Sequence, residues 1–176
     1  MASAGGDVGS LADLPAKLER WPAIANVLGA LGRGESGTVD GAWGSSCALI
    51  CGTIARSAPS TLLIVLPRIS DVDDFAADLA WHLSASPAVF SAWDGQPGDR
   101  TIADPVFSSR LQLLQRLSSK EAPRVVVCSL AALMQPVPAR QERALATRRI
   151  AVGESLDVDE LLEWLVDRGF ERTSAI

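Results

Sequence analysis

The sequence predicts an α/β domain with a mostly parallel sheet flanked by helices. Two runs carry this prediction, residues 61–66 and 124–128, because both are strongly apolar and show no alternating polar face. Strands of that composition are typical of parallel sheets buried on both faces. Segments with helical periodicity alternate with these runs, and that order produces parallel strands joined by helices.

The N-terminal part of the chain is expected to be helical. Residues 1–10 are small and polar, which favours a disordered terminus. Leu11 to Leu31 reads as a helix that Pro22 should break or kink, and a glycine-rich loop follows it. We therefore expect a disordered terminus, a helical segment with its loop, and an α/β domain, at residues 1–10, 11–37 and 38–176.

A turn and a buried helix open the main domain. A short strand, Thr38–Asp40, is expected to lead into a glycine-bearing turn, Gly41–Ala48. From Ser45 to Arg56 the residues are small and apolar with no internal charge. A helix that is apolar all round is expected to be buried.

The middle of the chain predicts two more helices with a strand between them. Ser70, with Asp73 three residues later, resembles a helix N-cap, and Pro87 should close that helix. A short strand is expected at Ala88–Phe90. Asp104 is then the expected cap of a helix that begins at Pro105, because proline suits the first helical position.

The C-terminal part predicts a short turn, an edge strand and a last helix. The turn runs from Ser129 to Met134, and Arg148–Val152 alternates weakly, which favours an edge strand. Asp157 and Glu160 have the spacing of a capping box.

The end of that last helix also has a clear signal. Gly169 stands where a left-handed C-terminal residue is expected, and Phe170 can then pack back on Leu165, as in a Schellman motif.

Composition narrows the classes of function. The chain has 176 residues, 48% of them hydrophobic, which suits one domain with a substantial core. Its net charge of −5 argues against tight sequence-independent binding of nucleic acid. No apolar run reaches the ~18 residues of a membrane span. Three cysteines, too few for a disulfide framework, favour a reducing cytoplasm.

The turn at Gly41–Ala48 is the first candidate site. The phosphate-loop pattern is glycine, four residues, glycine, lysine, then serine or threonine. Gly41 matches, but Ser46, Cys47 and Ala48 replace the other three residues, while Gly44 and Ser45 lie within the loop. Without the lysine and the magnesium-binding hydroxyl, we do not expect ATP hydrolysis. A tight strand-to-helix turn without a ligand is the competing interpretation.

Cys47 is a second candidate, as a nucleophile, because a thiol at a helix N-terminus can have a lowered pKa. A phosphatase loop needs an arginine six residues after its cysteine. Thr53 occupies that position after Cys47, and Ser57 occupies it after Cys51. A small buried cysteine is the competing and simpler role.

Three further groups of residues are candidate sites, and each also has a competing structural role. The acidic residues fit a solvated first helical turn better than paired catalytic carboxylates, which need one raised pKa. Trp93-Asp94 follows a strand, where sites of α/β proteins often lie, but a half-buried tryptophan at a strand end is the more common role. The basic group fits a solvated edge, with a nucleic-acid or protein contact as the alternative. The acidic and basic residues are Asp71, Asp73, Asp74 and Asp78, and Arg140, Arg143, Arg148 and Arg149.

The order of these motifs resembles a known family. Along the chain come the degenerate turn, a strand ending in Pro67, Trp93-Asp94, Ser109-Arg110-Leu111, residues 125–135, and Gly169-Phe170. This order is similar to the N-terminal module of bacterial transcription-repair coupling factors (Mfd), over roughly Leu11 to Ile176. That module in turn resembles the N-terminal domains of the excision-repair helicase UvrB. The family-motif positions are Trp93, Asp94 and Arg110.

The resemblance implies a RecA-like (P-loop NTPase-type) domain that has lost its ATPase, with no catalytic residue, metal or cofactor of its own. In the family, a separate motor domain uses ATP and magnesium to act on DNA and displace stalled RNA polymerase. Recruitment of the damage-recognition protein UvrA is implied through the adjacent domain. The chain stops before those domains, so we expect its apolar sheet edges to favour self-association.

Two other functions stay open at the level of sequence. One is a small cytoplasmic α/β enzyme that uses Cys47 at a helix N-terminus. The other is an ATP-binding domain like those of UvrB and related helicases, which would require nucleotide binding by the 41–48 loop.

Overall fold

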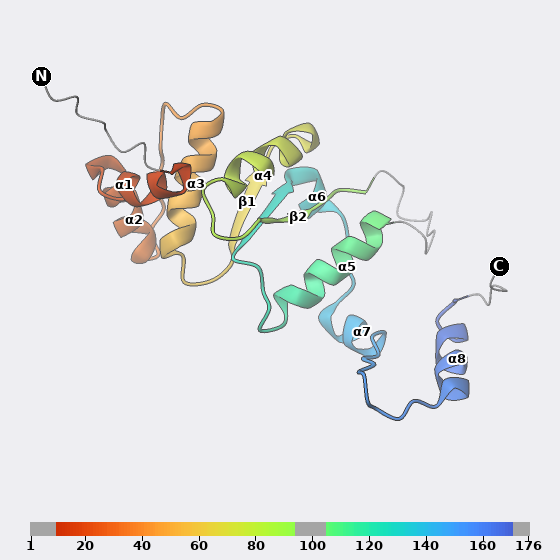
Figure 1. Cartoon of the computed structure of the whole chain (residues 1–176). Helices are drawn as coiled ribbons and strands as arrows, with labels where there is room; N and C mark the ends of the chain where they lie inside the picture. Colours follow the sequence, from red (N-terminus) through yellow and green to blue (C-terminus); the bar gives the residue numbers. More distant parts are fainter. Residues whose placement is uncertain (1–9, 94–104, 171–176) are drawn as a thin grey trace, which may run out of the picture.

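The computed structural model describes residues 10–93 and 105–170, and it contains a small parallel sheet between helices (Figure 1). The three strands are β1 (Leu62–Leu66), β2 (Ala88–Phe90) and β3 (Val125–Ser129). Their order is β1-β3-β2, and both pairings are parallel. The predicted α/β character with a parallel sheet is therefore confirmed.

The central strand and the edge strand differ in burial. Every residue of β3 is buried, as its uninterrupted apolar run predicts. In β1, Ile64 is buried but Leu63 and Val65 are exposed. The prediction of two buried faces is right for β3 and wrong for β1. The reason is position: β1 lies at the edge of the sheet, where helices cover only one of its faces.

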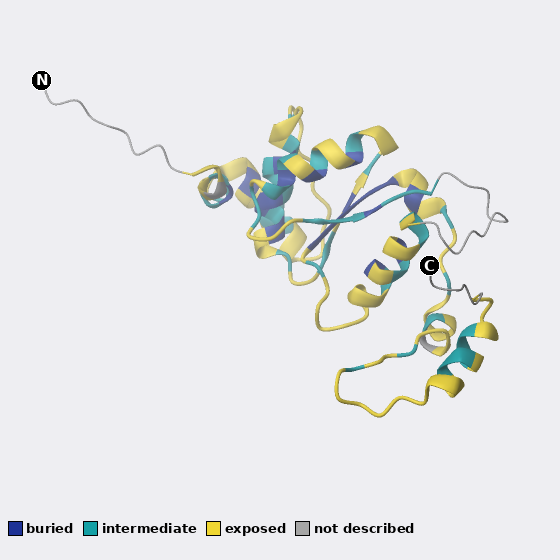
Figure 2. Ribbon diagram, turned by 45° about the vertical axis from the view of Figure 1, so that its right-hand side comes forward, coloured by how far each residue is buried: buried dark blue, intermediate teal, exposed yellow. Residues whose placement is uncertain are grey.

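Helices cover both faces of the sheet, and a different pair of helices lies on each face (Figure 2). On one face, α3 (Ser45–Ser57) and α4 (Val72–Ala80) enclose a core with residues of β1 and β3. On the other, α5 (Pro105–Leu117) and α6 (Leu130–Met134) pack against residues of β2 and β3. Pro105 opens α5 as expected, whereas its predicted cap, Asp104, lies outside the described residues.

The N-terminal helical segment is broken where proline predicts. A short 3-10 turn, η1 (Leu11–Asp13), leads into α1 (Leu14–Leu18), and α2 (Pro22–Gly32) follows. Trp21, the residue before the proline, is extended with φ −72° and ψ 126°, because the proline ring disfavours helical backbone there. The helix α1 then packs against α3.

Two predicted strands are absent from the described structure. Thr38–Asp40 and Arg148–Val152 form neither a strand nor a bridge, and both segments are largely exposed. A strand requires a neighbour that accepts its backbone hydrogen bonds, and neither segment reaches the edge of the three-stranded sheet. The loop at 41–48 therefore follows irregular chain rather than a strand.

Two local predictions also need correction. Ser70 does not cap α4: a short 3-10 turn, η2 (Ile69–Asp71), precedes the helix, and the Ser70 hydroxyl donates to the Asp71 carboxylate. The segment after Ser129 is the helix α6 rather than a turn. The Ser129 side chain accepts a hydrogen bond from the Ala132 amide, which is a helix N-cap.

The last two helices, α7 (Arg140–Leu145) and α8 (Val158–Val166), lie apart from the sheet layers (Figure 2). Asp157 caps α8 by accepting from the Asp159 and Glu160 amides, as predicted. The other half of the predicted capping box is not seen, because the Glu160 carboxylate pairs with Arg148 at 3.1 Å.

The C-terminal end of α8 confirms the predicted Schellman motif. The Phe170 amide donates to the Leu165 carbonyl at 3.1 Å, and the Gly169 amide donates to Val166 at 2.9 Å. Gly169 has φ +81°, a left-handed conformation that glycine adopts without a steric penalty. Among the described residues, no helix is long and apolar enough to cross a membrane.

Candidate functional site

The loop before α3 has the backbone of a tight helix entry. Gly41 has φ +76°, and Gly44, the N-cap of α3, has φ +53° and ψ −132°. An L side chain is strained at both positions, so the two glycines meet a backbone requirement. The helix begins directly after them at Ser45 (Figure 1).

Three amides of this loop have partners within the loop. The Trp43 amide donates to the Ser46 hydroxyl at 2.7 Å, and that hydroxyl donates to the Trp43 carbonyl at 2.7 Å. The Ser46 amide donates to Trp43 and the Cys47 amide to Gly44, at 3.2 and 3.0 Å. In a phosphate-binding loop, such amides point at the anion instead. The loop is therefore closed on itself.

A carboxylate stands at the start of α3. Ser45 Oγ donates to Asp78 Oδ2 at 2.6 Å, which links the first residue of α3 to α4. Negative charge is favourable at a helix N-terminus, because it interacts with the partial positive charge of the unpaired amides. Asp78 supplies that charge here, so a phosphate approaching the same helix end meets a like charge.

Beside this contact lies an open cleft of about 320 Å³. Its polar lining comes from Ser45, Ser46, Asp78 and His82, and leucine and tryptophan side chains form the rest. No lysine or arginine lines it. A cleft with one carboxylate and no cation does not suit a polyphosphate.

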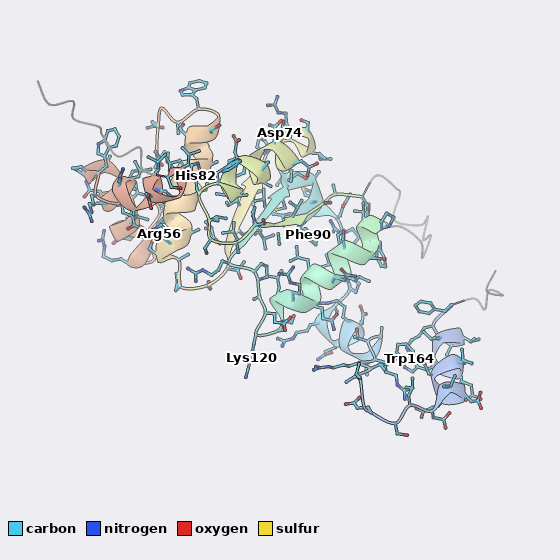
Figure 3. All side chains as sticks on the ribbon, in the orientation of Figure 1. Arg56, Asp74, His82, Phe90, Lys120 and Trp164 are labelled. Atoms are coloured by element: carbon cyan, nitrogen blue, oxygen red, sulfur yellow. The ribbon has the colours of Figure 1, made fainter. Side chains whose placement is uncertain are left out.

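Two of the cysteines, Cys51 and Cys128, have the surroundings of structural thiols, and Cys47 is half-buried in the first turn of α3. Burial, with a smaller effect of Cys47, raises the pKa of Cys51 to about 11. Burial also raises the pKa of the Cys128 thiol, which lies within hydrogen-bond reach of the Ile64 carbonyl at 3.6 Å. Arg56, near the C-terminal end of α3 (Figure 3), pairs with Glu19 at 2.9 Å. The described residues thus place no arginine in a phosphatase-like position.

Two family-motif residues, Trp93 and Arg110, come together at the carboxyl end of β2. Arg110, on α5, is only 2% exposed. Its guanidinium carbon lies 4.0 Å from the Phe90 ring centroid and 4.8 Å from that of Trp93. Nη1 donates to the Ser91 carbonyl at 2.6 Å, and both terminal nitrogens reach the Ala132 carbonyl. The other motif residue, Asp94, lies outside the described residues.

Gln135 completes this cluster, and sequence reasoning did not single it out. Its side-chain amide accepts from the Trp93 N–H at 3.0 Å and donates to the Trp93 carbonyl at 2.8 Å. The two bonds imitate the pairing of a neighbouring strand. Gln135 is the last residue of the mostly apolar segment 125–135. A polar side chain at that point is the one sequence feature that could have indicated its role.

The Arg110 cluster is the group of Phe90, Trp93, Arg110 and Gln135, with Phe107 packing on Trp93 at a ring distance of 5.8 Å. Burial lowers the pKa of the Arg110 guanidinium from its ordinary value. Arginine stays charged in proteins regardless, and here carbonyl oxygens and ring faces surround it. The cluster joins β2, α5 and α6, so its chemistry is that of a packing centre.

Apart from Asp78 and from Arg143, whose Nε is buried without a hydrogen-bond partner, the acidic and basic groups show ordinary surface roles. Hydrogen bonds from Arg68 and Ser70 lower the pKa of Asp71, and Asp73 and Asp74 are exposed in the first turn of α4. In the basic group, Arg148 is paired with Glu160, whereas Arg140 and Arg149 are exposed. The described ranges hold no cluster of three or more potential metal ligands.

Comparison of the sequence with protein-family models and with curated proteins finds no match. The described residues offer two candidate features. One is the 41–48 loop, with three amides bonded internally beside the Asp78 carboxylate, and the other is the buried Arg110 cluster at the end of the sheet.

Proposed function

We propose that this chain is a non-catalytic, RecA-like module from the N-terminal part of a transcription-repair coupling factor. The observation that carries the proposal is the 41–48 loop. It begins at Gly41 and runs into a helix, as a phosphate loop does, but Ser46, Cys47 and Ala48 stand where the second glycine, lysine and a hydroxyl would be. The Trp43, Ser46 and Cys47 amides are bonded within the loop, and the Asp78 carboxylate accepts from Ser45 at the start of the helix.

The Arg110 cluster is consistent with the same proposal. Trp93 and Arg110 both belong to the motif order on which the resemblance depends. They pack on each other, and the described residues hold no group of three potential metal ligands beside them. Residues that make only packing contacts are expected in a domain that acts as a scaffold rather than as an enzyme.

The proposed partners follow from the parent family. UvrA would be recruited through the adjacent domain, and RNA polymerase and DNA would be bound by further domains of the parent protein. ATP and magnesium would act in the parent's motor, while this module would hold no cofactor. The proposed location is the cytoplasm, without a membrane partner.

A genetic experiment tests the role in repair. The gene encoding the chain is deleted in its own organism, and removal of ultraviolet lesions is measured separately on the transcribed and non-transcribed strands. We expect repair of the transcribed strand to slow to the rate of the other strand. Reintroducing the intact gene should restore the difference. An unchanged strand difference in the deletion strain contradicts the proposal.

A binding experiment tests the loss of nucleotide binding. Titration calorimetry of the chain with Mg-ATP should give no saturable heat at millimolar nucleotide, because the lysine and the magnesium-binding hydroxyl are missing and three loop amides are already bonded. The matched variant combines Ser46→Gly, Cys47→Lys, Ala48→Thr and Asp78→Asn, and it should bind more tightly than wild type. Micromolar binding by the wild-type chain would support the helicase-like alternative instead.

A further inference from the structure

The cleft of about 320 Å³ beside the 41–48 loop has mostly apolar walls. Leu11 and Leu14 line it from η1 and α1, Leu49 lines it from α3, and Trp81 and His82 line it from the end of α4. Small-ligand pockets have volumes of roughly 300–1,000 Å³. The cleft therefore has room for one small ligand, or one side chain, with an apolar body.

A carboxylate in this cleft has one oxygen without a partner. Asp78 Oδ2 accepts from Ser45 Oγ at 2.6 Å, but no described residue donates to Oδ1 or pairs with Asp78 as a cation. The Ser46 hydroxyl is bonded to Trp43 within the loop. His82 Nδ1 is buried and has no hydrogen-bond partner among the described residues. The residues that line the cleft thus leave an anionic oxygen and an imidazole nitrogen unpaired.

The charge of the cleft is unbalanced as well. Asp78 is the only described acidic or basic residue that lines it. The start of α3 offers a partial charge of only about +0.5, which does not neutralise a carboxylate. Trp81, three residues after Asp78, is 67% exposed, and the face of an indole ring attracts cations. A carboxylate and an exposed indole in one cleft favour a cation over a neutral or anionic ligand.

We propose that this cleft binds an organic ammonium group on an apolar stem. The ammonium donates to Asp78 Oδ1 and lies against the Trp81 ring, while the stem packs against the leucine side chains. A bare metal ion suits the cleft less, because the described residues hold no group of three potential metal ligands. The proposal does not depend on the function proposed above.

Three ligands that share one stem test the role of charge in the wild-type chain. Binding of hexylamine, hexanol and hexanoate is followed through the backbone amide signals in two-dimensional NMR near neutral pH. Hexylamine should bind about tenfold more tightly than hexanol, because it adds a charged hydrogen bond, and hexanoate should not bind. The shifts should centre on Ser46, Leu49 and His82. Equal affinity for amine and alcohol, or shifts centred elsewhere, overturns the proposal.

Two asparagine variants form a matched pair for the same titrations. Asp78→Asn keeps an oxygen for Ser45 but removes the charge, so it should weaken hexylamine binding about tenfold and leave hexanol binding unchanged. Asp74→Asn, at an exposed position of α4 outside the cleft, should bind both ligands like wild type. Thermal unfolding confirms that each variant is folded. A folded Asp78→Asn that keeps its full affinity for hexylamine contradicts the proposal.

A capped lysine, acetyl-lysine methylamide, distinguishes two sources of the same ammonium chemistry. Affinity equal to that of hexylamine assigns the cleft to a lysine side chain of a partner protein. Weaker binding than that of hexylamine assigns it to a free amine. If neither ligand binds the wild-type chain, the cleft is not an ammonium site and the proposal is wrong.

Discussion

Arg110 shows at the scale of a single residue how a charge is kept in a small core. Two aromatic rings lie against its guanidinium, and two backbone carbonyls accept its hydrogen bonds. Hydrogen bonds from a charged group are stronger than neutral ones, which offsets part of the cost of removing the charge from water. The planar guanidinium matches both kinds of contact, so lysine is not equivalent.

Replacing Arg110 with methionine should destabilise the chain by roughly 2–3 kcal/mol, because the Ser91 and Ala132 carbonyls lose a charged donor. Urea unfolding followed by circular dichroism measures the free energy of unfolding. Arg116→Met, at an exposed position of the same helix, should change it by less than about 0.5 kcal/mol. Equal effects of the two variants would contradict a structural role specific to Arg110.

Cys51 predicts a loss of stability in alkaline solution. Its folded-state pKa is raised to about 11 from an ordinary value of 9.0, chiefly by burial. The protonated thiol is therefore favoured in the folded chain, and this contribution is fully present below pH 9. It is lost as the pH rises from 9 to 11, because the unfolded chain releases its proton first.

The measurement compares the free energy of unfolding of wild type and Cys51→Ala between pH 8 and 11. The decline above pH 9 should be smaller in the variant, which lacks the thiol. Parallel curves for the two proteins would mean that the Cys51 thiol titrates alike in the folded and unfolded chain.

At the scale of elements, the contact between α3 and α4 depends on Gly52. A Cβ built on Gly52 would lie 2.8 Å from His82 Cβ and 3.4 Å from the His82 carbonyl oxygen. The two helices approach closely at this point, and that approach brings Ser45 to Asp78 at the other end of the contact. The geometry of the 41–48 loop therefore depends on a glycine outside it.

Gly52→Ala should destabilise the chain by about 1–3 kcal/mol, the usual cost of overpacking a core. The matched control is Gly29→Ala on α2, where the nearest atom would lie at an ordinary 3.5 Å. That control should be neutral or slightly stabilising, because alanine favours a helix over glycine. Thermal or urea unfolding of both variants measures these changes in stability. A neutral Gly52→Ala would show that the two helices can separate without cost.

Local patterns predicted many elements because short-range chemistry determines them. Pro22 broke its helix, Asp157 capped α8, and Gly169 closed it, all through contacts within a few residues. The strands expected at 38–40 and 148–152 failed because a strand needs a distant partner. The sequence singled out Trp93 and Arg110 only through a resemblance, and their packing on each other, with Gln135 bonded to Trp93, required the folded chain.

At the scale of the whole molecule, one part of the chain encloses a hydrophobic core, and the C-terminal helix α8 does not contribute to it. The sheet and α3 to α6 hold both hydrophobic clusters, and α2 adds the buried Ile24, whereas α8 has no buried residue. Arg168 donates to the Leu145 carbonyl at the end of α7, and Arg148, in the segment between the two helices, pairs with the exposed Glu160 of α8. Trp164 of α8 is labelled in Figure 3. Exposed pairs of this kind contribute little stability.

The helices α7 and α8 should therefore open without unfolding of the sheet. Native-state hydrogen exchange should give the amides of α8 an opening free energy several kcal/mol below that of β3. Low concentrations of urea should lower the protection of β3 before they affect α8, which already exchanges through local opening. Equal protection of α8 and β3 would show instead that the chain unfolds as one cooperative unit.

By itself, the sequence determined both ends of α8, the proline break, the burial of β3 and the absence of the phosphate-loop glycine, lysine and hydroxyl at 46–48. These features depend on each residue's own backbone preference, polarity or functional group. Only the tertiary structure decided that one face of β1 stays exposed, that Asp78 holds the start of α3, and that Arg110 lies between two rings. Each of those depends on which distant segments pack together, and a local pattern carries no information on that choice.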